Sequence, residues 1–169
     1  FRSNTILKET YGYEQFRNLE IYDDLSKGKE KLCISQGQLI ENVILEAEKA
    51  WKGETQVDNI LLTAPTGSGK SLLFQLPAIY LGKEYNLLTI VVSPLKALIV
   101  DQVESLQELG YMRVAYASSD LSPEQKMEVY RQVREGEIDL FYLSPELLLS
   151  YDIKHFVGER RIGLVVVDE

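Results

Sequence analysis

The sequence predicts an α/β fold with a mainly parallel β-sheet flanked by helices in three layers. Five short apolar runs alternate with segments of helical character, at residues 59–63, 87–92, 113–117, 139–143 and 162–167. The runs are apolar on both faces, which is typical of strands that helices cover from both sides. The length of 169 residues suits one domain with a real core.

The segments between the runs carry helix signals. Apolar residues recur at three- and four-residue spacing over 39–51, so we expect an amphipathic helix there with Trp51 in the core. Ser-Pro-Glu-Gln at 122–125 combines a cap, a first-turn proline and a capping-box glutamine, and Gly136 supplies a stop for that helix. Ser-Pro-Glu at 144–146 opens a shorter helix in the same way.

The composition excludes several classes of protein. Lysine and arginine total 18 against 26 acidic residues, a net charge of −8, which is opposite in sign to a small basic nucleic-acid module. The one cysteine, Cys33, excludes an internal disulfide, and the one histidine, His155, is interpreted as a structural residue rather than a metal ligand. No apolar run approaches ~18 residues and no signal peptide is visible, so we expect a cytoplasmic protein without a membrane partner.

The two ends suggest a piece of a longer chain. The sequence opens on Phe1 rather than methionine, and it stops just after the apolar run 162–167. We therefore expect that further sequence belongs to the same domain.

The sharpest motif is Ala-Pro-Thr-Gly-Ser-Gly-Lys-Ser at 64–71, between a predicted strand and an apolar helix. This is the context of a phosphate-binding loop, although Ala64 stands where the strict pattern has glycine. Glycines let backbone N–H groups approach phosphate oxygens, and the following helix N-terminus favours an anion. A chance glycine-rich turn is the alternative, and the intact second half of the motif argues against it. The expected nucleotide contacts are Thr66, Gly67, Ser68, Gly69, Lys70 and Ser71.

Two acids follow the last apolar run. Asp168 stands where a phosphate-loop fold places its Mg²⁺-linked carboxylate, and Glu169 beside it is suited to polarise an attacking water. A solvated chain end is the alternative for this pair taken alone. Together with the loop, the pair predicts ATP and Mg²⁺ as cofactors, with Lys70, Asp168 and Glu169 as catalytic residues and Ser71 and Asp168 as metal ligands.

Several further stretches resemble the RecQ-like DNA helicases of helicase superfamily 2. Residues 93–103, SPLKALIVDQV, resemble the family's S-P-L-x-x-L-x-x-D-Q-V, where RNA helicases of the DEAD-box type carry a P-T-R-E-L-like motif. Residues 118–124 are similar to S-S-L-S-x-E, and FYLSPE at 141–146 resembles Y-V-S-P-E-R, with Leu147 in place of the arginine. The resemblance implies a RecA-like fold and a DNA helicase rather than an RNA helicase.

The N-terminus resembles the family's adenine-recognition stretch, F-G-Y-x-x-F-R-P-G-Q. Tyr13 and Arg17 match it, but Glu20 occupies the glutamine slot and a Gly-Gln pair recurs only at 37–38. The resemblance therefore implies an insertion over about 18–36, with Gln38 reading adenine. Glu20 is the alternative reader, and a carboxylate accepts but does not donate a hydrogen bond as an amide does. This divides the chain into an N-terminal segment, 1–36, and a RecA-like ATP-binding domain, 37–169.

The resemblance implies ATP hydrolysis that drives translocation on, and unwinding of, single-stranded or partly duplex DNA, with a second RecA-like domain in the parent chain. This chain alone should then bind and hydrolyse ATP poorly. Contacts to the DNA backbone are expected from Ser93, Pro94, Leu95, Lys96, Gln102, Ser118, Ser119, Ser144 and Pro145.

A different class of function stays open on the same residues. The chain could be an ATP-gated DNA- or protein-binding module of a larger complex, without unwinding activity. The expected insertion and Leu147, which stands in place of the arginine, are departures from the helicase pattern that are compatible with such a module. The acidic and aromatic residues at 20–24 suit a protein partner, and a solvated loop is the simpler interpretation of them.

Overall fold

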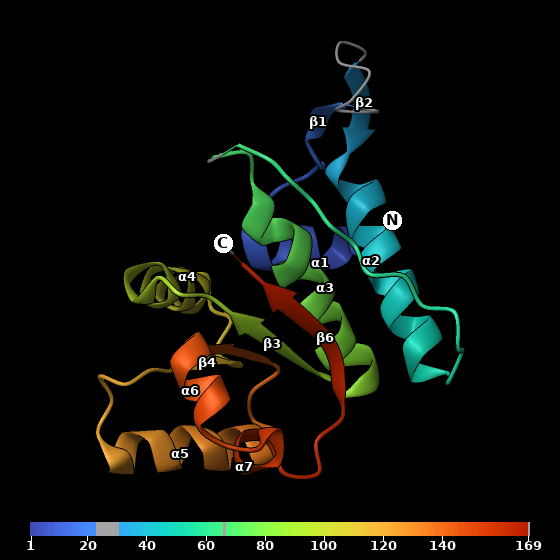
Figure 1. Cartoon of the computed structure of the whole chain (residues 1–169). Helices are drawn as coiled ribbons and strands as arrows, with labels where there is room; N and C mark the ends of the chain where they lie inside the picture. Colours follow the sequence, from blue (N-terminus) through green and yellow to red (C-terminus); the bar gives the residue numbers. More distant parts are fainter. Residues whose placement is uncertain (23–30, 66, 169) are drawn as a thin grey trace. The chain divides into compact units, whose positions relative to one another are not determined.

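The computed structural model describes residues 1–22, 31–65 and 67–168 (Figure 1). The chain divides into two compact units, 1–80 and 81–169. The first unit contains α1 (Asn4–Tyr11), the hairpin strands β1 (Asn18–Tyr22) and β2 (Lys31–Ser35), α2 (Gln36–Trp51) and most of α3 (Lys70–Tyr85). The second unit contains β3 (Leu88–Val92), α4 (Lys96–Glu108), β4 (Val114–Ala117), α5 (Pro123–Arg134), β5 (Leu140–Leu143), α6 (Pro145–Ser150), α7 (Ile153–Val157) and β6 (Ile162–Val167).

The second unit is built on a four-stranded sheet in the order β4-β5-β3-β6. All three strand pairs are parallel, so the expected parallel α/β architecture is confirmed. Four of the five predicted strands form, and every described residue of β3 and β5 is buried. The continuous apolar runs thus mark strands that are covered on both faces.

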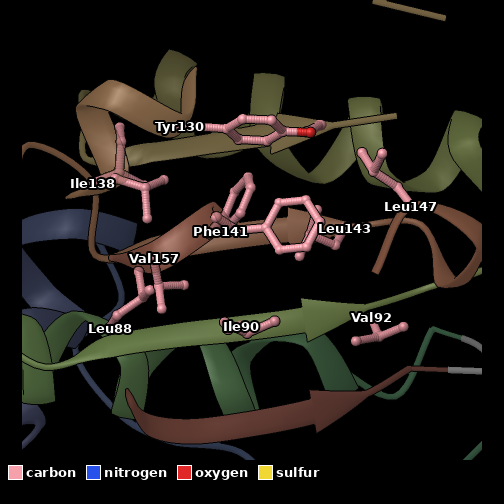
Figure 2. Close-up of a cluster of buried hydrophobic side chains, with 12 residues drawn as sticks. Leu88, Ile90, Val92, Tyr130, Ile138, Phe141, Leu143, Leu147 and Val157 are labelled. Carbon is pink, nitrogen blue, oxygen red and sulfur yellow. The ribbon is translucent and has the colours of Figure 1, made fainter. Parts of the chain in front are cut away.

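Helices α5, α6 and α7 cover one face of this sheet. Figure 2 shows Phe141 and Leu143 of β5 facing Tyr130 of α5, with Leu88 and Ile90 of β3 in the same cluster. Tyr142 alternates with its neighbours and points to the opposite face, where its hydroxyl bonds to Gln102 of α4. Helix α4 therefore covers the other side of the sheet.

Two features predicted from the sequence are wrong. Residues 59–63 form no strand, and Leu61 is 92% exposed. An extended segment becomes a strand only when it pairs with another strand's edge, and these residues pair with none of the described strands. Trp51 is 38% exposed rather than part of the core, because it is the last residue of α2.

The predicted helix starts are confirmed. Ser122 and Gln125 make both hydrogen bonds of a capping box at the start of α5, and α6 begins at Pro145. In the part of the chain that the structure describes, no helix is long and apolar enough to cross a membrane, and no group of three metal-ligating side chains occurs.

The expected insertion contains an antiparallel hairpin of β1 and β2. Its register runs from Asn18 opposite Ser35 to Tyr22 opposite Lys31. Cys33 lies on β2 and is exposed.

A charge network centred on the buried Asp139 lies at the amino ends of the strands. Asp139, just before β5, accepts two hydrogen bonds from Arg113, at 2.6 and 2.8 Å, and lies 3.4 Å from Arg160. Hydrogen bonding to Asp139 raises the pKa of Arg113, whereas burial lowers the pKa of Arg160. Gly82 of α3 packs so closely here that a Cβ would lie 2.6 Å from the carboxyl group of Asp139.

Replacing Asp139 with alanine should lower the free energy of unfolding by about 3–5 kcal/mol, because it leaves the buried Arg160 guanidinium without its counter-charge. The Arg160 side chain is only 6% exposed. The matched control is Glu137→Ala, which removes an exposed ion pair with Arg131 and should cost about 1 kcal/mol or less. Urea unfolding monitored by circular dichroism measures both, and equal costs would contradict this assignment.

Candidate functional site

The predicted site residues fall into two groups, one in each unit. In the second unit, the strand register aligns the carboxyl ends of the sheet: Leu143 lies between Val92 and Ala117, and Val92 also pairs with Val167. The residues that follow these strand ends, Ser93, Ser118, Ser144 and Asp168, therefore form a row along one edge. Open parallel α/β sheets bind their ligands at this edge.

The serines of this row are buried, whereas the residues that follow them are exposed or half-buried. Ser93, Ser118 and Ser144 are each no more than 3% exposed. The Ser93 hydroxyl accepts a hydrogen bond from the Leu95 backbone N–H at 3.5 Å, which shapes the turn into α4. Leu95 is half exposed, and Pro94 and Ser119 are also exposed, while Pro145 is half-buried at the start of α6.

Lys96 connects two of the predicted DNA-contacting segments. Its ammonium group donates to the Ser119 hydroxyl at 2.8 Å and to the Asp120 carboxylate at 2.7 Å. The SPL segment at the start of α4 and the Ser118-Ser119 turn after β4 are thereby brought side by side.

Gln102 has a different environment from the one expected of a DNA contact. Its side chain is buried, and its amide oxygen accepts from the Tyr142 hydroxyl at 2.8 Å. Its amide nitrogen donates to a carboxylate oxygen of Asp168 at 3.4 Å. The structure thus makes Gln102 a bridge between the sheet and Asp168, a role that sequence reasoning missed because the residue's position in a motif does not reveal its burial.

Asp168 is also fixed through its backbone. Its N–H donates to the carbonyl of Val92 at 2.9 Å, which continues the ladder between β6 and β3. Its side chain is partly exposed. Glu169 lies outside the described residues.

In the first unit, the phosphate loop has the backbone that its glycines predict. Gly67 and Gly69 have φ angles of 81° and 83°, in the left-handed region that favours glycine. The Ser68 N–H donates to the Pro65 carbonyl at 3.2 Å, and Lys70 is the first residue of α3, followed by Ser71. Thr66 lies outside the described residues.

Gln36 contacts this loop, and sequence reasoning did not identify it. Its amide nitrogen donates to the Ser68 carbonyl at 3.4 Å, and its amide oxygen accepts from the Arg17 backbone N–H at 3.2 Å. The prediction for the adjacent Gln38 concerns the edge of adenine and is separate from this contact.

The adenine-recognition stretch lies in the same unit as the loop. Tyr13 is 51% exposed and stacks on Tyr11, with ring centroids 6.5 Å apart and planes at 13°. Tyr11 is held in turn by its hydroxyl, which donates to Gln75 of α3 at 3.0 Å. Arg17 is exposed. The stretch therefore offers an open aromatic face and an open guanidinium.

The two candidate adenine readers differ in their surroundings. Gln38 is exposed, and its side chain accepts from the Ser35 N–H at 3.0 Å in the capping box of α2. Glu20 lies on β1 and pairs with Lys31 across the hairpin at 2.9 Å. The hydrogen bond from Lys31 lowers the pKa of Glu20.

Comparison with known proteins identifies the family. The model of the DEAD/DEAH box helicase family matches residues 38–169. The chain belongs to the DEAD/DEAH box helicase family. Membership in this family implies the use of ATP.

The curated relatives of this helicase domain include RecQ helicases. It is 31% identical over 168 residues to the ATP-dependent DNA helicase RecQ of Bacillus subtilis, covering 99% of this chain and 23% of that protein. It is 33% identical over 165 residues to the ATP-dependent DNA helicase RecQ of Synechocystis, covering 96% of this chain and 28% of that protein. The chain therefore spans about a quarter of the length of these two relatives.

A solved structure supports the fold. The crystal structure of DUF1998 helicase MrfA bound to DNA matches with a TM-score of 0.52 at 20% identity, over 83% of this chain and 19% of that one. The parallel sheet with its flanking helices is consistent with a RecA-like fold.

Replacing Gln102 with leucine should lower the free energy of unfolding by about 1–3 kcal/mol, because the buried hydrogen bond from the Tyr142 hydroxyl to the Gln102 amide oxygen is lost. The half-buried Gln107 of the same helix is the matched control, and Gln107→Leu should have little effect. In the Gln102→Leu background, Tyr142→Phe should destabilise the protein less than it does in the unaltered chain, since the bond between the two side chains is already lost. An undiminished cost of Tyr142→Phe in that background, measured by urea unfolding, would contradict the bridge.

Proposed function

We propose that this chain is the ATP-binding domain of a RecQ-like DNA helicase, in which ATP hydrolysis drives translocation on DNA and strand separation. The single observation that carries the proposal is the phosphate loop with its two left-handed glycines at the start of α3. The relatives named ATP-dependent DNA helicase RecQ support the choice of DNA over RNA.

The loop residues fit a nucleoside triphosphate. A Cβ at Gly67 would meet nothing within 4 Å, so the loop leaves open space there. Among the residues described, the buried Ser68 hydroxyl has no hydrogen-bond partner. Backbone N–H groups in such a loop bind anions, and the N-terminus of α3 adds its positive dipole end. In this proposal Lys70 binds the β- and γ-phosphates.

The metal would be held by Ser71 and Asp168, whose hydroxyl and carboxylate oxygens are the ligand types that Mg²⁺ prefers. When bound, Mg²⁺ neutralises charge on the phosphates. Gln102 orients the Asp168 carboxylate, and Glu169 positions the attacking water. Tyr13 and Arg17 pack on adenine, and Gln38 reads its edge.

DNA contacts are proposed for the exposed part of the second unit's edge. The candidates are the exposed or half-buried residues of this edge, Pro94, Leu95, Lys96 and Ser119. The three buried serines, Ser93, Ser118 and Ser144, shape the loops instead. Contacts of this kind go to the sugar–phosphate backbone and are independent of sequence. A second RecA-like domain of the same protein is the proposed partner in the cycle.

The native protein should hydrolyse ATP, with strong stimulation by single-stranded DNA, weaker stimulation by duplex DNA and little by single-stranded RNA. Lys70→Ala should abolish the stimulated rate, because the loop loses its charge at the β- and γ-phosphates. Steady-state phosphate release measures this. A flat, low rate with every nucleic acid would exclude the helicase and favour the ATP-gated binding module.

Lys96→Ala should weaken DNA binding by a similar factor for unrelated sequences and reduce the slope of log affinity against log salt by about 1, because one phosphate contact is lost. Fluorescence anisotropy over a salt series measures this. The control is Lys154→Ala in α7, since Lys154 is also an exposed lysine but lies outside the proposed edge. An unchanged salt slope for Lys96→Ala would remove this residue from the interface.

A further inference from the structure

Gln36 is a buried residue whose side-chain amide makes one hydrogen bond through its oxygen and one through its nitrogen. It is the first residue of α2 and is only 2% exposed. Its amide oxygen accepts from the Arg17 N–H, and its amide nitrogen donates to the carbonyl of Ser68 in the phosphate loop. An amide that joins two backbone segments in this way fixes one against the other.

The residue that bonds to the amide oxygen of Gln36, Arg17, lies at the base of the β1–β2 hairpin. Asn18 pairs with Ser35 as the last residue pair of the hairpin register. Arg17 and Gln36 are the next residues outward, and the Gln36 N–H donates to the Arg17 carbonyl at 2.9 Å. Gln36 is thus held by two hydrogen bonds to one residue, one through its backbone and one through its side chain.

The contact also explains a property of the phosphate loop. A Cβ at Gly69 would lie 2.7 Å from the amide nitrogen of Gln36. The φ angle of 83° is what favours glycine at position 69, and the Gln36 amide occupies the space beside it. The same atom that bonds to the Ser68 carbonyl packs against Gly69, so the amide lies against two consecutive loop residues.

This role does not come from the adenine-recognition pattern. In F-R-P-G-Q, the position before Gly-Gln is proline, which has no side-chain hydrogen-bonding group. In this chain that position is Gln36, at the end of the insertion.

We propose that Gln36 is a positioning residue, which holds the phosphate loop in its nucleotide-binding conformation from the base of the β1–β2 hairpin. The inference rests on the proposed function, because it assumes that the loop binds the phosphates of ATP. Gln36 itself touches loop backbone rather than the reacting atoms.

The test measures nucleotide binding by the native protein and three variants at Gln36. Gln36→Met keeps the length of the side chain but removes both hydrogen-bonding ends, and Gln36→Ala removes the side chain. Both should weaken ATP binding by about three- to tenfold, the effect of one or two lost hydrogen bonds. The KM for ATP should rise, while kcat at saturating ATP stays within about twofold, because the loop is still formed when nucleotide is bound.

Gln36→Glu separates positioning from simple packing. The carboxylate still accepts from Arg17, but it cannot donate to Ser68 and places a negative charge beside a phosphate-binding loop. Its loss of ATP affinity should exceed that of Gln36→Met and should shrink as salt screens the charge. Adenosine, which lacks phosphates, should bind to all three variants as it does to the unaltered protein.

The matched control is Gln125→Ala at the start of α5. Gln125 also accepts a backbone N–H with its side chain, from Ser122 at 2.9 Å, but it serves only as a helix cap. Its replacement should leave ATP affinity unchanged. Urea unfolding of every variant reports any general loss of stability.

The outcomes separate the inference from the proposed function. Unchanged ATP affinity in Gln36→Met, with binding lost in Lys70→Ala, would overturn the inference and leave the proposed function intact. Equal losses for ATP and adenosine would also overturn it, because they would assign Gln36 a purely structural role. If the unaltered native protein binds no ATP, the proposed function fails and the inference fails with it.

Discussion

The parallel backbone ladder between β3, β4, β5 and β6 is the constraint on which the second unit depends. Because Val92, Ala117, Leu143 and Val167 end their strands at the same level, each residue that follows is delivered to one edge of the sheet. The backbone hydrogen bonds of the sheet therefore determine where the residues that follow the strands lie. The apolar cluster beneath this ladder fixes the spacing of the layers, and the Asp139 network secures its opposite end.

The features that were predictable from the sequence are those with a strong local cause. Buried parallel strands have continuous apolar runs in their sequence, and the capping box at Ser122 is a pattern of neighbouring residues. Both elements are therefore predictable from local sequence. The strand expected at 59–63 has the same local pattern, but strand formation depends on a partner that its own residues do not specify. The glycines of the phosphate loop were predictable because a backbone conformation demands them. Gln36 and Gln102 were missed for the opposite reason, since their roles depend on atoms that lie 32 and 66 positions away along the chain.

Two glutamine amides have analogous roles in the two units. Gln36 joins a hairpin base to the phosphate loop, and Gln102 joins a strand to Asp168. An amide suits such a position because it donates and accepts at once and carries no charge that would compete with phosphate or metal. Arg17 and Gln36 bond directly to each other at the two ends of the hairpin, where the sequence predicts that an insertion begins and ends.

The position of Cys33 has a practical consequence. It is the only cysteine of the chain, and it is exposed on β2, within the hairpin whose base holds Gln36. A thiol-reactive dye or spin label would attach at this one place without any engineered substitution. The chain thus carries its own reporter group on the hairpin, and the signal of that label could be recorded while the proposed nucleotide and nucleic-acid ligands are added.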